Sequence, residues 1–417
     1  MRVCYVVSTF PRYEGDPEVT WMQEKVRCLK RRGVDVTIFA PSFKGLGSHY
    51  FEGIPVHRFR YFFKPWERLT HNEGATNKIQ RSPLYAALAL FYIIFGSIAM
   101  LRHCAVHRYD IFHAHWPFPH ALFAWIGARL QRATFCLRFY GAELVLSDRF
   151  PPAKPFLRFF MRRADGMDSN SSFSKAKAEA LLPGCMVTPI PDGAPIHVDP
   201  SMLPSLRPTD PARSGPKRLF FMARLIERKG AEYLVRAMPQ VRSRVPDVQL
   251  VLAGGGHRSV EIEQAIREGN LEDCVTMAGR ISDEERDRNY AECDIFVLPA
   301  VVDKGGDTEM LGVVFLESMA NRKPVIASSV GGIPDAVVHE ETGLLVPERD
   351  SAALADAIVR VLTEPGLAER LGEGGYRRVQ EFFSWDRIVN QSLDAYADAQ
   401  RAASLKRRKR SHPHDVS

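Results

Sequence analysis

Short continuous apolar runs alternate along the 417-residue chain with stretches that have helical spacing. The run "RVCYVVST" (2–9) predicts a buried strand, "EVTWMQEKVRCLKRRG" (18–33) a helix ended by Gly33, and "VDVTIFAP" (34–41) the next strand. Similar runs predict strands at 110–115, 133–141 and 186–193. Continuous apolar strands that alternate with helices indicate a parallel sheet with helices on both faces.

A second series of the same kind follows a stretch rich in Pro and Ser at 201–217, which is typical of a linker. Its strands are predicted at 218–224, 248–256, 274–279, 294–300, 323–329 and 343–347. The pattern therefore predicts an α/β protein with two tandem Rossmann-like, doubly wound domains, at 1–203 and 217–384. Ligands of such sheets bind beyond the carboxyl ends of the strands. Two domains of this kind facing each other would place the site in the cleft between them.

Composition fits a globular chain, with 45% hydrophobic and 25% charged residues. The seven cysteines include no Cys-x-x-Cys pair, which argues against a disulfide framework or a cysteine zinc site and favours reduced thiols in the cytoplasm. The N-terminus has no long apolar segment typical of a signal peptide. Charge is uneven, at +10 over 1–200, −7 over 201–405 and +4 over 406–417. The first half therefore suits an anionic partner.

Two cations follow the strand predicted at 218–224. Arg224 and Lys229 fall in the loop at the carboxyl end of this strand, ahead of a helix that starts near Ala231. Two cations at such an edge suit a diphosphate, one for each phosphoryl group, and would stabilise the charge of a leaving group. The alternative is a solvated loop with ordinary surface charges.

Two glutamates lie in the apolar stretch "DTEMLGVVFLESMA" (307–320). Gly312 precedes the start of helical spacing at Val313, so Glu309 lies before a helix N-terminus and Glu317 inside the helix. Carboxylates in apolar surroundings are costly unless they are paired, and hydrogen bonds from vicinal hydroxyls of a polyol would offset that cost. The alternative is one exposed glutamate and one that complements the helix dipole.

These two motifs in this order resemble the nucleotide-sugar glycosyltransferases of family 4, which have the glycosyltransferase-B fold. The segment "ARLIERKGAEYLVRAMP" is similar to their GRL…KG segment, and "AGGGHRS" to their glycine-rich loop. "MAGRISDEERDRNYAECDIFVLPA" and "EMLGVVFLESMANRKPVIASSVGGIPDAVVHEETGLLVP" match the blocks that follow, including the paired glutamates E-x7-E. The resemblance covers 218–347.

The resemblance implies a role for each matching residue. Arg224 and Lys229 would hold the donor diphosphate, Glu309 would contact the transferred sugar, and Glu317 would hold the ribose. The other residues expected around the donor are Gly254, Gly255, Arg280, Ile281, Gly312, Val313 and Val314. The last three would cap the phosphates through backbone N–H groups, and Arg280 and Ile281 would lie near the base.

The family retains anomeric configuration and usually works without a metal, so we expect no metal and no cofactor besides the nucleotide sugar. In agreement, the sequence contains no Asp-x-Asp that would hold a divalent ion. A helix at 385–403 is expected to cross back onto the first domain, as in the family. The basic stretch 404–417 is expected to be a disordered tail.

The first half matches the family less tightly. Gly15 lies in the predicted acceptor loop, or is an ordinary turn glycine. "YDIFHAHW" places His113 or His115 on the acceptor side, although a histidine at a strand end is often structural. In "RFYGAEL", Tyr140 stands where many members have His, and Glu143 where an acidic residue is usual. Tyrosine is a poor proton acceptor near neutral pH. The departing diphosphate oxygen would then take the acceptor proton.

The stretch 84–101 is apolar and uncharged, at the lower limit of length for a membrane-spanning helix. Spanning would divide one α/β domain across the bilayer, so two readings remain: a helix buried in the domain, or one with a face in the lipid interface. Aromatic and basic residues interleave at 58–68 and 154–163, as in proteins that lie on membranes. The same interleaving suits single-stranded nucleic acid, but no nucleic-acid motif accompanies it.

The function expected from these features is transfer of a sugar, with retention, from a nucleoside-diphosphate sugar to a glycan or lipid-linked oligosaccharide in polysaccharide biosynthesis. The expected location is the cytoplasm, with possible peripheral contact to the inner face of the membrane. Two alternatives are another glycosyltransferase-B enzyme, such as a nucleotide-sugar epimerase, and a non-catalytic protein that binds sugar nucleotides. A product assay with and without acceptor distinguishes the epimerase from a transferase, because an epimerase needs no acceptor.

Overall fold

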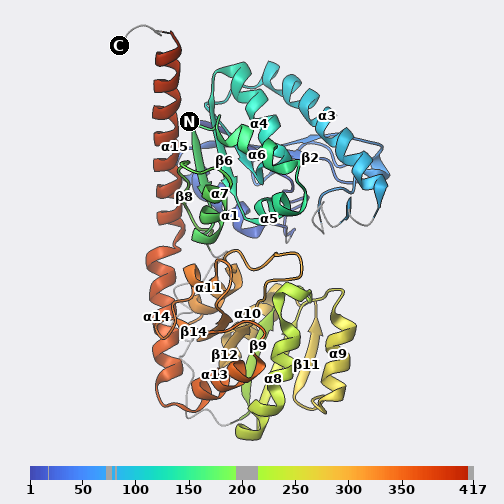
Figure 1. Ribbon diagram of the computed structural model, residues 1–417, viewed down its shortest axis with the longest axis vertical. Coiled ribbons are helices and arrows are strands. Elements are labelled where there is room, and N and C mark those ends of the chain that lie inside the picture. Colours follow the sequence, from blue (N-terminus) through green and yellow to red (C-terminus); the bar gives the residue numbers. More distant parts are fainter. Residues whose placement is uncertain (17, 72–77, 80–81, 194–214, 412–417) are drawn as a thin grey trace. The chain divides into compact units, whose positions relative to one another are not determined.

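The computed structural model describes residues 1–16, 18–71, 78–79, 82–193 and 215–411 (Figure 1). The chain divides into two compact units: Met1–Asp192 with Trp385–Ser417, and Gly193–Ser384. The predicted linker at 201–217 and the boundary at 203 fall largely outside the described residues.

The first unit contains an eight-stranded sheet in the order β3-β4-β2-β1-β5-β6-β7-β8. Its strands are β1 (Arg2–Val6), β2 (Asp35–Pro41), β3 (His49–Phe51), β4 (Ile54–Phe59), β5 (Ile111–His115), β6 (Thr134–Phe139), β7 (Gly166–Ser169) and β8 (Thr188–Pro189). β3 pairs antiparallel with β4, and the pairs from β4 to β8 are parallel. The strand order reverses between β1 and β5, the position at which such sheets bind ligands.

Helices cover both faces of this sheet because successive side chains of a strand point to opposite sides. On β1, Cys4 and Val6 belong to one core, and Val3 and Tyr5 to another. The first core is shared with α3 and α4, and the second with α1 and α15. The helices of this unit are α1 (Thr20–Arg31), α3 (Pro83–Val106), α4 (Pro117–Gln131), α5 (Ala142–Arg149), α6 (Ala153–Met161), α7 (Ser172–Leu181) and α15 (Trp385–Ser411), with a short 3-10 turn η1 (Lys64–Trp66).

The second unit contains a parallel six-stranded sheet in the order β11-β10-β9-β12-β13-β14. Its strands are β9 (Lys217–Met222), β10 (Val248–Ala253), β11 (Val275–Gly279), β12 (Ile295–Leu298), β13 (Val325–Ser328) and β14 (Gly343–Val346). Its helices are η2 (Glu227–Lys229), α8 (Ala231–Arg244), α9 (Ser259–Glu268), α10 (Asp283–Glu292), α11 (Val313–Ala320), α12 (Ile333–Ala336), α13 (Ser351–Thr363) and α14 (Leu367–Phe382). Every residue of β12 and β13 is buried, so helices cover both faces here as well.

Two parallel α/β sheets confirm the predicted fold class, and the differences are local. The predicted strand 186–193 is reduced to the two residues of β8, and β3, β4 and β7 were not predicted. The aromatic and basic stretch 58–68 begins inside β4. The expectation of a disordered tail from 404 is wrong as far as Ser411, because α15 continues to that residue. Residues 412–417 of that tail lie outside the described part of the chain.

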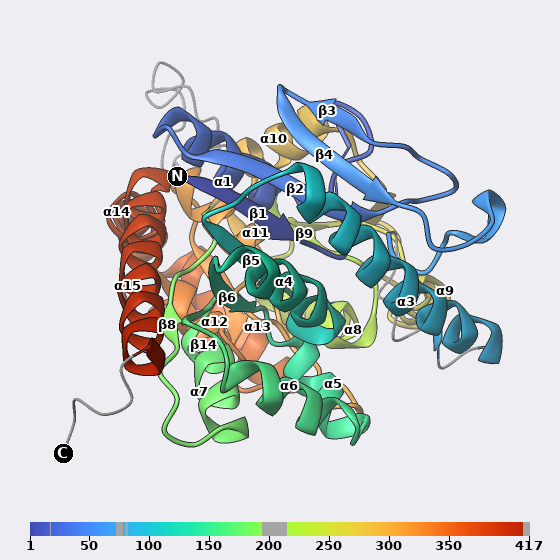
Figure 2. The same cartoon turned by 90° about the horizontal axis from the view of Figure 1, so that it is seen from above.

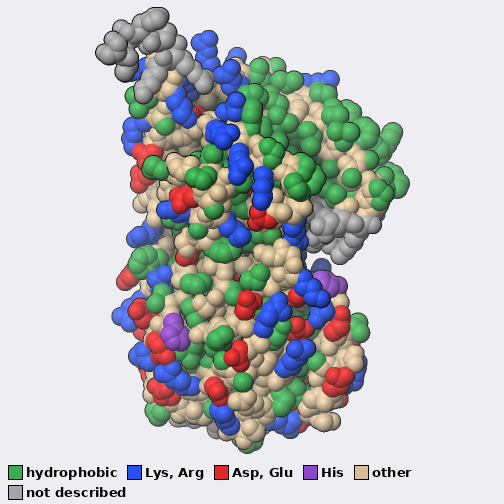
Figure 3. All heavy atoms as spheres, viewed as in Figure 1, with side chains coloured by type: hydrophobic (Ala, Val, Ile, Leu, Met, Phe, Trp, Pro, Cys, Tyr) green, Lys and Arg blue, Asp and Glu red, His purple; other side chains and the backbone are tan. Residues whose placement is uncertain are grey.

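Helix α3 has one buried face and carries apolar side chains on its exposed faces as well. Leu88, Tyr92 and Met100 lie on its buried face, and Figure 2 shows α3 beside α4. Its other faces expose large apolar side chains, namely Leu84, Leu90, Phe91, Ile94, Phe95, Ile98, Leu101 and Val106. Among the described helices, α3 is the one long and apolar enough to cross a membrane by length and composition. Hydrophobic side chains accordingly gather on the surface over α3 in Figure 3.

Candidate functional site

In the second unit, the predicted donor residues come from loops at one edge of the sheet. The strands are parallel, so their carboxyl ends lie together, and the strand order reverses between β9 and β12. Arg224 and Lys229 follow β9, while Glu309 lies in the segment between β12 and α11. The fold therefore brings two loops that are 80 residues apart in sequence to the same point of the edge.

An ion pair joins these two loops. The Nζ of Lys229 donates to the Oε2 of Glu309, and both side chains are nearly buried, at 12% and 11% exposed. Arg228 adds a second positive charge: one guanidinium nitrogen lies 3.8 Å from the same carboxylate oxygen and donates to the Thr308 carbonyl at 3.0 Å. Arg224 is exposed, and its charge also acts on Lys229. Two cations thus lie beside one buried carboxylate, and a third acts on the lysine of the pair.

Gly230 allows the lysine loop to approach the end of β12. Its φ is +69°, and a Cβ built on it would lie 1.8 Å from the carbonyl oxygen of Pro299. The Val301 N–H donates to the Arg228 carbonyl at 2.9 Å, which holds the two loops together. A side chain at position 230 would push Lys229 away from Glu309.

The start of α11 presents free backbone N–H groups. Gly312 precedes the helix with φ +80°, and a Cβ on it would lie 2.4 Å from the ring of Phe315. No side chain caps this N-terminus, so the N–H groups of Val313 and Val314 face away from the helix with the positive end of its dipole. This arrangement suits an anion.

The two glutamates differ in their electrostatic surroundings. Burial opposes ionisation of Glu309, but the charges of Lys229 and Arg228 outweigh it and lower its pKa to about 2. Burial raises the pKa of Glu317, although the Tyr290 hydroxyl donates to its Oε2 at 2.8 Å. Glu309 is therefore a carboxylate held among cations, whereas Glu317 has a single neutral donor and capacity for further hydrogen bonds.

The remaining predicted donor residues lie at the same edge. Gly254 and Gly255 follow β10, and Arg280 and Ile281 follow β11. Arg280 is exposed and Ile281 packs partly against the core. The structure thus places all of these residues at the carboxyl ends of neighbouring strands, and their roles in binding stay predictions.

In the first unit, the two predicted histidines belong to a buried polar network. His113 is 1% exposed, and its Nδ1 lies 2.9 Å from the Tyr396 hydroxyl and its Nε2 3.1 Å from Asp168. His115 is fully buried, with its Nδ1 2.8 Å from the Tyr140 hydroxyl. The network centres on Arg138, which is also fully buried and pairs with Asp168 and Asp192.

Tyr140 and Glu143 follow β6 at the carboxyl edge of the first sheet. Burial raises the pKa of Tyr140 further above its ordinary value, so its hydroxyl is a donor near neutral pH. Glu143 is 3% exposed; its Oε1 accepts from the Tyr140 N–H at 2.7 Å, and burial raises its pKa to about 7. Gly15 lies in an exposed loop with φ +84° and open space around it.

Sequence reasoning gave no role to Arg228, Tyr290, Arg138 or Asp168, which the structure places beside the predicted residues. Tyr290 was visible only as the tyrosine of a matched block, and Arg228 only as the neighbour of Lys229. Arg138 and Asp168 lie on different strands of one sheet, and no sequence spacing links them.

Comparison with known proteins gives the family of the chain. Residues 205–378 match the family described as "Glycosyl transferases group 1", and residues 19–184 match the "Glycosyl transferase 4-like domain". The chain is 28% identical to a "GDP-mannose-dependent alpha-(1-6)-phosphatidylinositol monomannoside mannosyltransferase" of Mycobacterium tuberculosis, over 94% of this chain and 97% of that one. It is 36% identical to the amylovoran biosynthesis glycosyltransferase AmsK of Erwinia amylovora, over 35% of this chain and 36% of AmsK.

Solved structures share the fold. A sucrose-phosphate synthase from Thermosynechococcus elongatus superposes with a TM-score of 0.69 at 24% identity, covering 95% of this chain and 98% of that one. Anabaena HepE, solved with UDP and glucose, superposes with a TM-score of 0.68 at 19% identity, covering 95% of this chain and 99% of that one. The chain is a group 1 glycosyltransferase with the glycosyltransferase-B fold.

Proposed function

We propose that this enzyme transfers a sugar, with retention of anomeric configuration, from a nucleoside-diphosphate sugar to a glycan or lipid-linked oligosaccharide. The observation that carries the proposal is the buried pair of Lys229 and Glu309, with Arg228 beside it, at the edge where the strand order reverses. Burying a carboxylate and the two cations beside it costs desolvation free energy, which folding alone gives little reason to spend. The arrangement suits a site that must bind both phosphates and hydroxyls.

Donor binding would redistribute these charges. The Lys229 ammonium turns from Glu309 to the diphosphate, and Arg224 approaches the same phosphates from the exposed side of the loop. Glu309 is then released to accept hydrogen bonds from hydroxyls of the sugar. As the bond from sugar to phosphate breaks, the two cations stabilise the departing diphosphate, so the transfer step needs no metal in this proposal.

The other donor contacts follow the edge of the sheet. The N–H groups at Val313 and Val314 cap a phosphate, and Glu317, oriented by Tyr290, accepts from the ribose hydroxyls. The remaining residues proposed around the nucleotide are Gly254, Gly255, Arg280 and Ile281. The relatives bear names that include GDP-mannose, so a GDP-sugar is the first donor to test, followed by UDP-sugars.

Retention is supported by the weak basicity of the site. Before donor binding, Lys229 and Arg228 lower the pKa of Glu309 to about 2; when Lys229 turns to the diphosphate, Arg228 stays beside Glu309 and still opposes its protonation, so it is a poor base for an inverting displacement. The departing phosphate oxygen would instead take the proton of the acceptor hydroxyl. Gly15, His113, His115, Tyr140 and Glu143 are proposed to shape the acceptor side from the first unit.

A lipid-linked acceptor is supported by the apolar surface of α3. Its buried face ties it to the core of the first unit, so the exposed face would rest on the inner face of the membrane rather than cross it. Exposed aromatic side chains also occur in the two aromatic and basic stretches, at Phe63, Trp66 and Phe159. Arg163 lies over the Phe159 ring, 3.4 Å from its centroid. Rings at the acyl boundary with cations on lipid phosphates hold peripheral proteins on a bilayer.

Substitution of Lys229 by Ala tests the proposal. Loss of one charge that stabilises the leaving group is expected to lower kcat about 10²–10³-fold, measured with labelled donor and a lipid-linked acceptor. Lys217→Ala, at the opposite end of β9, is the matched control and should leave turnover unchanged. Unchanged turnover in Lys229→Ala would contradict the proposed role, and a product formed without any acceptor would favour an epimerase.

A further inference from the structure

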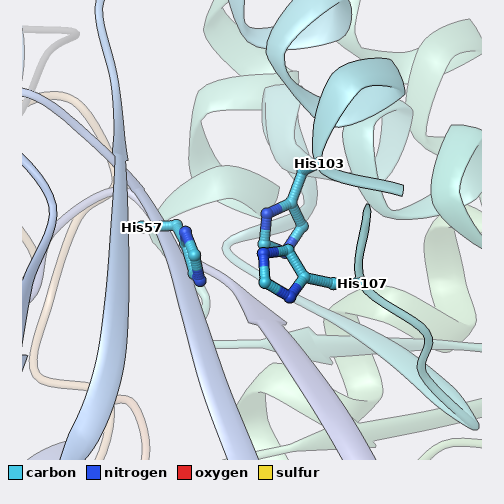
Figure 4. A group of neighbouring side chains, drawn as sticks. All are labelled: His57, His103 and His107. Carbon is cyan, nitrogen blue, oxygen red and sulfur yellow. The ribbon is translucent and has the colours of Figure 1, made fainter. Parts of the chain in front are cut away.

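Three histidines to which the proposed function gives no role converge in the first unit. His57 lies on β4, His103 in the last turn of α3, and His107 directly after that helix (Figure 4). The ring centroids are 4.4 Å (His57–His103), 4.8 Å (His57–His107) and 4.6 Å (His103–His107) apart. One nitrogen from each ring lies within 4.8 Å of the other two.

The backbone explains why the rings meet. His103 and His107 are four residues apart, so they project from the same side of the helix end. The neighbouring strand β4 packs against α3 and brings His57 to them. All three rings line a cavity of about 500 Å³, whose walls also include Phe39, Ser48 and Phe95. The cavity leaves room for an ion and for water molecules on it.

The chemistry of the rings favours a cation. Imidazole is the commonest protein ligand of transition metals, and each of these rings has a nitrogen close to the other two. The Nε2 of His103 lies 2.9 Å from the hydroxyl of Tyr109, which leaves Nδ1 for a ligand. A hydrogen bond of this kind to the second ring nitrogen orients histidines that bind metals.

An anion is the alternative occupant, because Arg58, Arg60 and Arg102 also line the cavity. Two of these guanidinium groups are already committed. Arg58 donates to the carbonyls of Phe10, Pro11 and Pro41, and Arg60 donates to Glu67 and to the Phe62 carbonyl. Arg102 is exposed, where solvent screens its charge. The Nε of Arg58 is buried without a hydrogen-bond partner, so the cavity offers three imidazole nitrogens to a cation and this N–H with Arg102 to an anion.

We propose that His57, His103 and His107 bind one divalent transition-metal ion of the Zn²⁺ type, with water as the fourth ligand. Imidazole nitrogens suit Zn²⁺, Ni²⁺ or Cu²⁺ rather than Mg²⁺ or Ca²⁺. Tetrahedral Zn–N bonds of about 2.0–2.1 Å place the ligand nitrogens about 3.3 Å apart, so the rings rotate slightly on binding. The ion fastens the end of α3 to β4 and takes no part in the transfer reaction.

The test uses the full-length chain without a histidine tag, stripped of metal by a chelator and titrated with Zn²⁺ and with Co²⁺. The expected result is one ion per chain, visible absorption of tetrahedral Co²⁺, and an increase in Tm with Zn²⁺. His57→Gln and His107→Gln keep polar side chains of similar size and should lose all three signals. His257→Ala, at an exposed position of the second unit, is the matched control and should keep them.

The proposal is overturned if the wild-type chain binds no ion stoichiometrically, or if the variants bind it as the wild type does. Titration with inorganic phosphate addresses the other occupant: phosphate binding that His107→Gln abolishes, without metal binding, would make the cavity an anion site. Circular dichroism identifies any variant that has lost its fold. The remaining glutamine variant then decides the question, since each substitution removes one ligand.

Discussion

At the scale of single residues, two buried glutamates show how surroundings decide protonation. Glu309 lies among the charges of Lys229 and Arg228, and its pKa is lowered to about 2. Glu143 has backbone N–H groups near it but no cation, and burial raises its pKa to about 7. One side chain type therefore provides a permanent anion in the second unit and a group that titrates near neutral pH in the first.

Glu143 predicts a pH dependence of stability. Its folded pKa lies above the ordinary 4.5, so the folded state holds the proton more tightly than the unfolded chain. This contribution is fully present below pH 4.5 and is lost as the pH rises through 7. Glu143→Gln keeps a neutral side chain at every pH. Its stability relative to the wild type should therefore increase between pH 4.5 and pH 7.5, by up to about 3 kcal/mol.

Urea unfolding of the wild type and of Glu143→Gln at both pH values measures this difference. A constant difference between Glu143→Gln and the wild type across the range would show that Glu143 does not hold a proton in the folded state.

At the scale of elements, α3 is unusual because its apolar residues extend around the helix. A helix that packs on a sheet needs only one apolar stripe, and Leu88, Tyr92 and Met100 already supply it. The apolar residues on the other faces add nothing to the core, and exposed apolar patches of this kind mark interaction sites. The surface over α3 therefore fits the membrane contact proposed above.

Replacing Phe91 and Ile94 together by Glu tests this contact. Both side chains are exposed, at 39% and 45%, and neither belongs to the buried core, although the Phe91 ring also contacts Phe62 and Phe95, so circular dichroism must first show that the variant keeps its fold. Removing two apolar side chains from the lipid interface and adding two anions near lipid phosphates should weaken binding to anionic vesicles at least about 10-fold. Vesicle sedimentation at low salt gives the measurement.

The matched control is Val260→Glu on α9, which is 68% exposed in the second unit and should leave vesicle binding unchanged. If wild-type protein stays in the supernatant with anionic vesicles, the proposed membrane contact is wrong, and the exposed face of α3 would bind a different partner.

At the scale of the whole molecule, the end of the chain completes the unit formed by its beginning. Helix α15 contacts α1, β6 and β7, and its residues Val389, Tyr396 and Ala399 are buried in the core of the first unit. The Tyr396 hydroxyl joins the Tyr5 hydroxyl at 3.0 Å and His113 at 2.9 Å. The first unit therefore cannot complete its core until the last helix has been synthesised.

Tyr396→Ala should reveal this dependence. Loss of a buried ring and its hydrogen bonds is expected to destabilise the first unit by about 3–5 kcal/mol. Tyr396→Phe removes only the hydroxyl and should cost about 1–2 kcal/mol. Chemical denaturation, followed by the fluorescence of Trp21 and Trp116 in the same unit, compares the two variants with the wild type. Equal stability of all three proteins would mean that α15 is not needed to hold the first core.

Much of the fold was predictable because most of its strands and helices depend on residues close together in sequence. Continuous apolar runs gave most strands of the two sheets, such as β9 and β10, although their predicted ends extended too far. The strands that were missed carry weak local signals: β3 has three residues, β7 has four, and the polar side chains of His57 and Arg58 interrupt the apolar pattern of β4. Gly312, which breaks the apolar run ahead of Val313, likewise showed a helix start between Glu309 and Glu317.

The sequence by itself determined two parallel α/β sheets, a loop with two cations, and two glutamates around a helix start, because strand runs and helix signals depend on neighbouring residues. Only the tertiary structure decided that Lys229 meets Glu309, that His113 is sealed inside a polar network, and that α3 is half exposed. It also brought His57 to His103. Those pairings depend on which strands become neighbours, and strand order is set by packing of the whole sheet rather than by any one segment.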